Sequence, residues 1–223
     1  KVLCIFTVIL VLLAGQCQAA RKYKTLNQWR GCNVAFLGDS MTDKRHIGTS
    51  KNYWQYLEEM LGLRPLVYGI NGHQWTGVME QAARLAASGE KVDAIVIFAG
   101  TNDFNAGVPV GEWYDVQTDD VPVANGRVVQ RQRRTLNMDA ETFCGRINGV
   151  MSFLKSSFPE AQIILLTPIH RAYARFSEGN VQPDESYANS AGVFFDRYVN
   201  ALRQAAGVWA VPVLDLNSLS GLY

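Results

Sequence analysis

Five short runs of Val, Ile, Leu and Phe alternate along the chain with longer stretches whose apolar residues recur at helical spacing. Apolar residues are nearly continuous within each run, which is typical of strands buried on both faces of a parallel sheet. Alternation of such strands with helices predicts an α/β fold with helices on both faces of the sheet. The predicted strands are residues 33–37, 65–68, 92–99, 162–167 and 208–216.

Four segments between these runs have the periodicity of amphipathic helices. They are residues 53–61, 77–87, 140–158 and 187–206. In the third of them, five apolar residues follow one helical face, as expected for a helix packed on a sheet: Phe143, Ile147, Val150, Met151 and Leu154.

One polar stretch, residues 104–137, interrupts the alternation directly after the third predicted strand. Asn125-Gly126 in its middle is a strong β-hairpin signal. Ligands of open α/β sheets bind at the carboxyl ends of the strands, so we expect this insertion to form a lid over a site there. No repeat or linker divides the chain, and we expect one domain over residues 20–223.

Residues 1–19 predict a secretory signal peptide. Lys1 precedes an apolar run at residues 2–15, and small and polar residues follow at 16–20. Because this run is too short to span a bilayer comfortably, we expect cleavage after Ala19 and a secreted or periplasmic protein without stable membrane insertion. An uncleaved anchor and a lipid attached to Cys17 are the alternatives.

The charge balance argues against a nucleic-acid partner. Lys and Arg total 21 and Asp and Glu total 20, so the chain lacks the strong positive field that binds a phosphate backbone. The three histidines, His46, His73 and His170, are scattered, and no spaced Cys/His set predicts a metal site. We therefore expect neither a metal nor a cofactor.

The cysteines do not define a disulfide framework. Cys4 and Cys17 lie in the predicted signal peptide, which leaves Cys32 and Cys144. An oxidising compartment permits a bridge between these two, and burial as free thiols is the alternative; the sequence leaves both open.

The first predicted strand ends in Gly38-Asp39-Ser40, which places a serine at the carboxyl end of a buried strand. A hydroxyl at such a turn is held over the sheet edge, where backbone N–H groups can receive a developing oxyanion. We therefore consider Ser40 a candidate nucleophile. The alternative is a serine that caps a helix after an ordinary turn.

Two further glycine-marked turns end the second and third predicted strands. Gly72 closes the first of these turns, and Asn102 lies in the second. Carboxyl ends of parallel strands meet at one edge of a sheet. The N–H groups of Ser40 and Gly72 and the side-chain amide of Asn102 are therefore predicted to surround one oxyanion. Each feature alone is also compatible with simple turn chemistry.

These blocks, Gly38-Asp39-Ser40, Gly72 and Gly100-Thr101-Asn102-Asp103, together resemble those of the SGNH or GDSL hydrolase family. The resemblance covers almost all of the mature chain. It implies a flavodoxin-like three-layer sandwich with a five-stranded parallel sheet. It also implies a Ser40 nucleophile, an oxyanion hole at Ser40, Gly72 and Asn102, and hydrolysis of carboxylic esters.

The family pattern contains a fourth block, an Asp and a His separated by two residues, after the fifth strand. We expect that block, and the closing helix, to lie beyond Tyr223. The chain is then a fragment with little or no activity, because a serine hydroxyl needs a base. Asp43 and His46 fit the spacing, but we interpret them as a chance match in a charged stretch. Ser190 loosely resembles a nucleophile elbow, yet no strand precedes it, and we expect it on a helix surface.

The expected substrate is an ester, and we expect an acetylated acidic glycan. We expect His73 and His170 at the rim of the site and Trp113 against a sugar ring, all contacting the substrate. A turn histidine satisfied within the fold, a supporting role for His170 and an aromatic that packs the lid are the alternatives. Arginines suit carboxylates, and four follow in the polar stretch: Arg127, Arg131, Arg133 and Arg134. The sequence thus predicts a secreted esterase that removes O-acetyl groups from a glycan. A lipid or lysophospholipid esterase and a non-catalytic glycan-binding protein on the same fold are the alternatives.

Overall fold

The computed structural model describes residues 27–45, 48 and 50–221. The predicted signal peptide, with its cleavage site, and His46 therefore lie outside the described residues. Five strands form the central sheet: β1 (Asn33–Gly38), β2 (Arg64–Val67), β3 (Ala94–Phe98), β6 (Gln162–Leu166) and β9 (Val213–Leu214). All neighbours pair in parallel, in the order β2-β1-β3-β6-β9. This is the flavodoxin-like order, which confirms the predicted fold class and places the topological switch point between β1 and β3.

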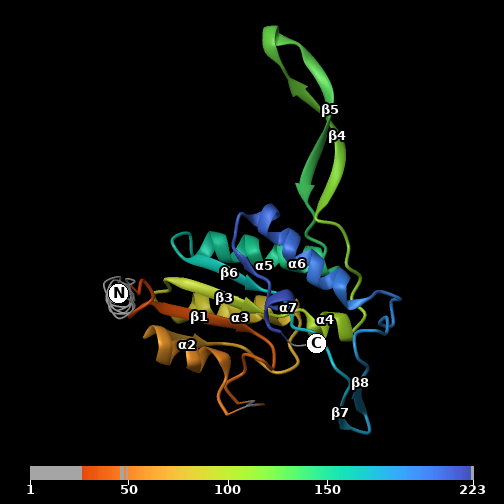
Figure 1. Cartoon of the computed structure of the whole chain (residues 1–223). Coiled ribbons are helices and arrows are strands. Elements are labelled where there is room, and N and C mark those ends of the chain that lie inside the picture. The colour runs from red at the N-terminus through yellow and green to blue at the C-terminus, as the bar shows by residue number, and fades with distance from the viewer. Residues whose placement is uncertain (1–26, 46–47, 49, 222–223) are drawn as a thin grey trace, which may run out of the picture.

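Helices cover both faces of the sheet, as predicted (Figure 1). On one face lie α3 (Trp75–Ser88), α5 (Phe143–Ser157) and α6 (Phe195–Trp209), and on the other lies α2 (Tyr53–Leu61). Successive residues of β1 point to opposite faces: Ala35 and Leu37 join the first cluster, and Val34 and Phe36 join the second. The nearly continuous apolar runs in the sequence thus reflect strands that are buried on both sides.

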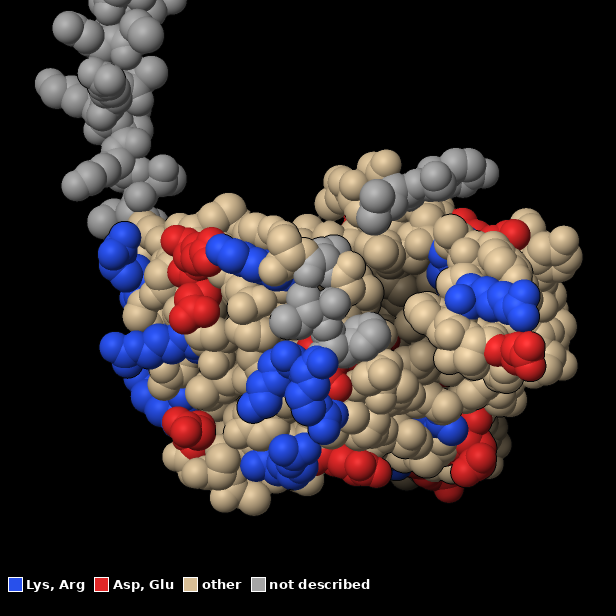
Figure 2. Space-filling model, turned by 90° about the horizontal axis from the view of Figure 1, so that it is seen from below, with Lys and Arg blue, Asp and Glu red and all other residues tan. Residues whose placement is uncertain are grey.

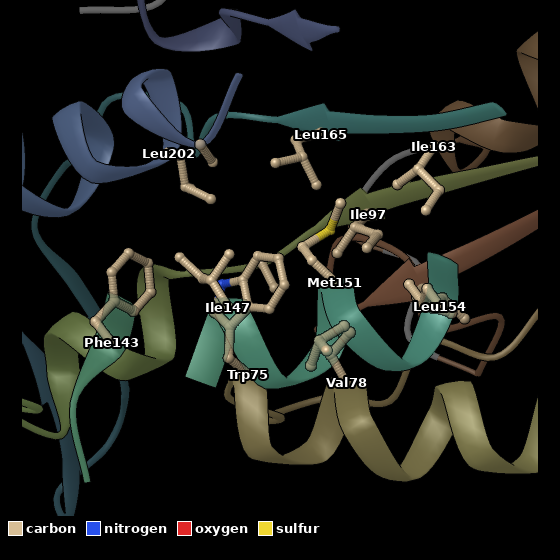
Figure 3. Packing of buried hydrophobic residues seen from close by; sticks show 14 of the residues in the cluster. Trp75, Val78, Ile97, Phe143, Ile147, Met151, Leu154, Ile163, Leu165 and Leu202 are labelled. Carbon is tan, nitrogen blue, oxygen red and sulfur yellow. The ribbon is translucent and has the colours of Figure 1, made fainter. Parts of the chain in front are cut away.

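The larger core lies between the sheet and the three helices on that face (Figure 3). Trp75 from α3 meets Phe143 from α5 edge to face, with 6.4 Å between ring centroids. Burying each large apolar side chain contributes roughly 1.5–3 kcal/mol. The helical face predicted for α5 is the buried one: Phe143, Ile147, Val150, Met151 and Leu154 all have almost no exposed surface.

The last helix and the last strand differ from the prediction. Residues 208–216 were predicted as one strand, but α6 continues to Trp209 and β9 consists of two residues only. Ala210 ends the helix in a left-handed conformation, and Pro212 has no N–H to donate to a sheet. The continuous apolar run therefore joins the end of a helix to a short strand.

Residues 187–194, predicted as helix, form a loop organised by one asparagine. The Asn189 side chain accepts hydrogen bonds from the backbone N–H of Ala191 and Val193. Its amide donates to the carbonyl of Phe104 and the hydroxyl of Tyr198. These bonds replace those a helix would make, so the expectation that the neighbouring Ser190 lies on a helix surface is wrong.

The polar insertion contains a long two-stranded ribbon, β4 (Tyr114–Pro122) and β5 (Val128–Leu136), joined by a single 3-10 turn at Ala124–Gly126. Asn125 and Gly126 have φ of 64° and 69°, so the predicted turn is confirmed. The ribbon projects from the side of the molecule that carries α5 and α6 (Figure 1).

A second, shorter hairpin was not predicted. It comprises β7 (Ala174–Ser177) and β8 (Asn180–Gln182) and lies near the carboxyl ends of the sheet strands (Figure 1). Two short helices complete the described chain, α4 (Thr101–Asn105) directly after β3 and α7 (Leu216–Leu219) after β9. The segments that follow β1, β2, β3 and β6 therefore gather at one edge of the sheet.

Three further properties concern the described residues alone. None of their helices combines the length and the hydropathy that crossing a bilayer requires. They contain no cluster of three or more metal-ligating side chains. Cys32 and Cys144 are both free thiols, and Cys144 is buried in α5.

Gly38 of β1 lies in close contact with Phe98 of β3, and its replacement by alanine is expected to destabilise the fold. A Cβ at Gly38 would lie 2.2 Å from the Phe98 carbonyl oxygen, and its φ of 149° is one that L residues rarely adopt. We expect Gly38→Ala to lower the free energy of unfolding by about 3 kcal/mol, measured by urea denaturation.

Gly149→Ala is the matched control. A Cβ there would make only ordinary contact, 3.5 Å from the Met79 methyl group, in the middle of α5. It should leave stability unchanged or raise it by about 0.5–1 kcal/mol. Equal effects of the two substitutions would contradict the close approach at Gly38.

Candidate active site

The turn that carries Ser40 is held by a buried glutamine from α3. The Gly38 N–H donates to Gln81 Oε1 and Gln81 Nε2 donates to the Gly38 carbonyl, both at 2.8 Å. The Asp39 N–H donates to the carbonyl of Phe98 at the end of β3, at 3.3 Å. Gln81 is fully buried. These bonds fix the backbone just before Ser40, whose side chain remains partly exposed.

The turn after β2 is fastened to the turn after β1. The N–H of Ile70 donates to the Gly38 carbonyl at 3.1 Å, and the N–H of Asn71 donates to Asp43 Oδ2 at 2.9 Å. The two turns pack so closely at Gly69 that a Cβ there would lie 2.5 Å from the Cβ of Thr42. Gly72, the predicted oxyanion donor, follows directly with a φ of 80°.

Asn102 is held beside the turn of Gly72. Its side-chain amide donates to the carbonyl of His73 at 3.0 Å. An amide nitrogen carries two hydrogens, so one more can be donated to another acceptor. The turn after β3 is thus connected to the turn after β2 through the residue next to Gly72.

A buried ion pair braces the same junction. Asp103 is fully buried, and its carboxylate accepts from the first N–H of α3, at Trp75, and from Arg146 of α5 at 3.0 Å. Burial raises the pKa of Asp103 to about 6, although the hydrogen bond from Arg146 opposes the shift. Asp103 therefore joins the turn that bears Asn102 to two helices.

Ser40 opens onto a cleft with about 590 Å³ of open space. The cleft lies between the carboxyl edge of the sheet and the segment that follows β6, and a hollow is visible on this side of the molecule (Figure 2). Lysine, arginine, aspartate and glutamate side chains are interspersed on this surface (Figure 2). The lining includes Ser40, Met41, Thr101, Pro168, His170 and Gln182.

His170, a predicted substrate-contacting residue, shares this cleft with Ser40. Its Nδ1 lies 2.6 Å from Glu185 Oε1, and Glu185 Oε2 accepts the N–H of Arg171 at 2.9 Å. Glu185 therefore fixes two consecutive residues of the cleft wall.

The other two predicted contact residues lie elsewhere. The His73 ring packs against Gly77 of α3, and its Nδ1 lies 3.1 Å from Gln81 Nε2. The ring therefore belongs to the hydrogen-bond network through which Gln81 supports the Ser40 turn. Trp113 is 9% exposed and donates from Nε1 to Gln204 at the base of the long ribbon. Neither side chain lines the Ser40 cleft.

The long ribbon likewise contributes no residue to the lining of the cleft. The expectation that residues 104–137 close over the site is therefore not met in this structure. Instead, Gln182 of the shorter hairpin lines the cleft. A polar hairpin turn in the sequence identifies the ribbon but does not determine the direction in which it projects.

Asp43 has a structural role in the turn after Ser40. The side chain of Arg45 and the N–H of Asn71 both donate hydrogen bonds to its carboxylate. These bonds hold the pKa of Asp43 well below its usual range, and the bond from Arg45 is the largest cause. The carboxylate thus joins two turns.

Sequence reasoning missed several residues that build the site: Gln81, Arg146, Arg171 and Glu185. Gln81 left one usable signal, a polar side chain on the face of α3 that otherwise buries Val78, Ala82 and Leu85. The others come from segments whose contacts are set by the tertiary structure. Asp103 belongs to the predicted block Gly100-Thr101-Asn102-Asp103, but its contacts with Trp75 and Arg146 were not predicted.

Asp39 is a second buried carboxyl group, next to Ser40. Burial raises the pKa of Asp39 to about 7; the N–H of Met41, at 3.0 Å, lowers it, and the charge of Asp103 adds to the increase. In the unfolded chain an aspartate ionises near 3.8. As the pH rises from about 4 to about 7, the unfolded state loses this proton while the folded state keeps it, so stability falls.

Asp39→Asn is expected to flatten this pH dependence, because asparagine does not titrate and keeps the acceptor for Met41. The melting temperature of the variant minus that of the parent should increase from about pH 4 to about pH 7 and level off above that. Asp103 is present in both proteins, so only its coupling to Asp39 contributes to the difference. A difference that does not change with pH would show that Asp39 is not held in its neutral form.

Solved structures share this fold. A possible lipase from Chitinophaga pinensis is 25% identical with a TM-score of 0.64, and the alignment covers 83% of this chain and 67% of that chain. A Lactobacillus plantarum protein is 23% identical, with a TM-score of 0.63 and coverages of 86% and 80%. A member of the lipolytic protein G-D-S-L family from Veillonella parvula is 12% identical, with a TM-score of 0.51 and coverages of 84% and 79%.

A comparison with curated proteins finds no match. The sequence model of the GDSL-like Lipase/Acylhydrolase family, in contrast, matches residues 36–221. The match includes the turns that follow β1, β2 and β3 and the segment that forms the opposite wall of the cleft. The chain therefore belongs to the GDSL-like lipase/acylhydrolase family.

Proposed function

We propose that this protein is a secreted serine esterase in which Ser40 attacks the carbonyl carbon of a carboxylic ester. One observation carries the proposal: hydrogen bonds fasten three turns to one another at one sheet edge, where Ser40 opens onto a cleft. The family supports ester hydrolysis in general. Export is part of the proposal because residues 1–19 have the layout of a signal peptide.

The reaction proceeds in two halves. Ser40 Oγ bonds to the acyl carbon, the carbonyl oxygen becomes an oxyanion, and the alcohol leaves with a proton. Water then attacks the acyl-Ser40 ester and releases the acid. The N–H groups of Ser40 and Gly72 and the amide of Asn102 are proposed to stabilise both oxyanions, because fixed donors need no reorganisation as the charge develops.

A base must accept the Ser40 proton as the hydroxyl attacks. His170 lines the same cleft with its Nδ1 beside Glu185, and we propose that it contacts the substrate. A soluble base can take the proton instead. Added imidazole is therefore expected to accelerate the Ser40-dependent reaction of this chain.

Ser40→Ala tests the nucleophile. The parent and the variant are compared on p-nitrophenyl acetate, with and without imidazole, and the variant gives the background rate. We expect the parent to exceed this background, and the excess over the variant measured at the same imidazole concentration to rise with imidazole. A p-nitrophenyl phosphonate should label the parent at Ser40, as seen by mass spectrometry. Equal rates in the two proteins and no label would favour a non-catalytic binding protein.

Asn102→Ala tests the oxyanion hole. Loss of one donor should lower the Ser40-dependent rate by roughly 10²- to 10³-fold, while the variant, which also loses the hydrogen bond to His73, stays folded at the assay temperature. An effect of less than about threefold would remove Asn102 from the oxyanion hole.

We propose O-acetyl groups of an acidic glycan as the substrate. Tyr173 follows the cleft wall directly and is 60% exposed, and the exposed aromatic face suits a sugar ring. The arginines of β5 suit carboxylates, although the ribbon does not line the cleft. A lipid ester is the second candidate, because Phe176 and Val181 on the shorter hairpin are exposed apolar side chains close to Gln182 of the cleft.

Acyl-chain length distinguishes the two candidates. Acetyl and octanoyl esters of p-nitrophenol are compared for the parent and for Phe176→Ser. A glycan deacetylase should prefer the acetyl ester and respond little to the substitution. A preference for the octanoyl ester that Phe176→Ser abolishes would replace the glycan proposal with the lipid one.

A further inference from the structure

We infer that Arg171 is a positioning residue for the proposed reaction: its side chain holds α4 so that Asn102 is presented to the oxyanion. The inference rests on the function proposed for Ser40 and Asn102. Arg171 lies on the opposite wall of the cleft from Ser40, and it is not one of the proposed oxyanion-hole donors.

The guanidinium group of Arg171 binds both ends of α4. Nη1 donates to the Thr101 hydroxyl, and Nη2 donates to Asn105 Oδ1 at 2.7 Å. Residues four apart lie on the same side of a helix, so one side chain spans the whole of this five-residue helix. Asn102 lies between the two anchored positions.

An aromatic pair supports the same guanidinium group. Its carbon lies 5.0 Å from the ring centre of Phe104, which belongs to α4, and 5.5 Å from that of Phe195, the first residue of α6. The two rings meet edge to face, 5.2 Å apart. Cation–π contacts of this kind stabilise a buried or half-buried arginine and make a third contact with α4.

α4 needs such support because it is too short to be stable alone. A five-residue helix completes hardly more than one turn, and helix nucleation is unfavourable. Its N-cap, Gly100, offers no side chain to cap it and has a φ of 133°. The position of Asn102 therefore depends on tertiary contacts, of which Arg171 supplies three.

The partial burial of Arg171 argues for a geometric role over a stabilising one. Its Nε is buried without a hydrogen-bond partner, and burial lowers the pKa of the side chain. In the described part of the chain, no carboxylate forms a salt bridge with its guanidinium group; Glu185 binds its backbone N–H instead. A half-buried cation without a salt bridge costs free energy that an apolar side chain of similar length would not, and the charge of Glu185 offsets only part of this cost.

Three variants separate this role from a general effect on folding. Arg171→Met keeps the length and removes the donors, and Arg171→Lys keeps the charge but cannot reach both acceptors in the fixed geometry of a guanidinium group. Arg175→Met is the matched control, since Arg175 is an exposed arginine four residues further along the same segment.

The kinetic test measures phosphonate labelling of Ser40 at increasing probe concentrations. Arg171→Met should lower the maximal labelling rate about 10- to 100-fold and leave the half-saturating concentration nearly unchanged, because the interaction lost acts on the transition state. Arg171→Lys should lie between Arg171→Met and the parent, and Arg175→Met should match the parent.

A double-mutant cycle shows whether Arg171 acts through Asn102. In the Asn102→Ala background, Arg171→Met should change the labelling rate by less than about twofold, because the group that it positions is gone. The same 10- to 100-fold loss in both backgrounds would overturn the inference. So would an unchanged labelling rate in Arg171→Met.

An NMR measurement tests the position of Asn102 without depending on enzyme activity. In ¹⁵N-labelled protein, the side-chain amide signals of Asn102, assigned by their loss in Asn102→Ala, should shift or broaden in Arg171→Met and stay unchanged in Arg175→Met. If Ser40 is not labelled at all, the proposed function fails, and these signals still decide whether Arg171 positions Asn102. Unchanged Asn102 signals in Arg171→Met refute the inference while leaving the function of Ser40 intact.

Discussion

The double hydrogen bond between Gln81 and Gly38 is the interaction on which the site depends. A buried amide from α3 satisfies both backbone groups of the residue at the end of β1, at 2.8 Å each. Removing either group would leave a buried polar partner unsatisfied, at a cost of about 1–3 kcal/mol. Because Gly38 also approaches the Phe98 carbonyl too closely for a side chain, sheet, helix and nucleophile turn meet at a single residue.

Hydrogen bonds between turns connect Gly38 to the rest of the site. Asp43 and the Gly38 carbonyl hold the turn after β2, and His73 holds Asn102. Asp103 then ties the third turn to α3 and α5. Polar groups buried in this way are costly unless satisfied, so each bond restricts the backbone to one arrangement. A fixed arrangement is what an oxyanion hole requires, since its donors must be in place before the charge appears.

The sequence predicts the parts of the fold whose pattern is local. The α2 helix occupies the predicted residues 53–61, and the strand order follows from alternation and the resemblance together. Residues 208–216 fail because an apolar run carries no mark of where a helix ends and a strand begins. Ser40, Gly72 and Asn102 are visible because turns at strand ends have a signature. Arg171 and Glu185 are not, because their partners lie up to 70 residues away.

The most direct measurement of the central claim is a crystal structure of the chain after reaction with a p-nitrophenyl phosphonate. The account predicts phosphorus bonded to Ser40 Oγ and one phosphonyl oxygen within about 3 Å of both the Gly72 nitrogen and the Asn102 amide nitrogen. An adduct on Ser40 whose oxygens point away from Gly72 and Asn102 would contradict it.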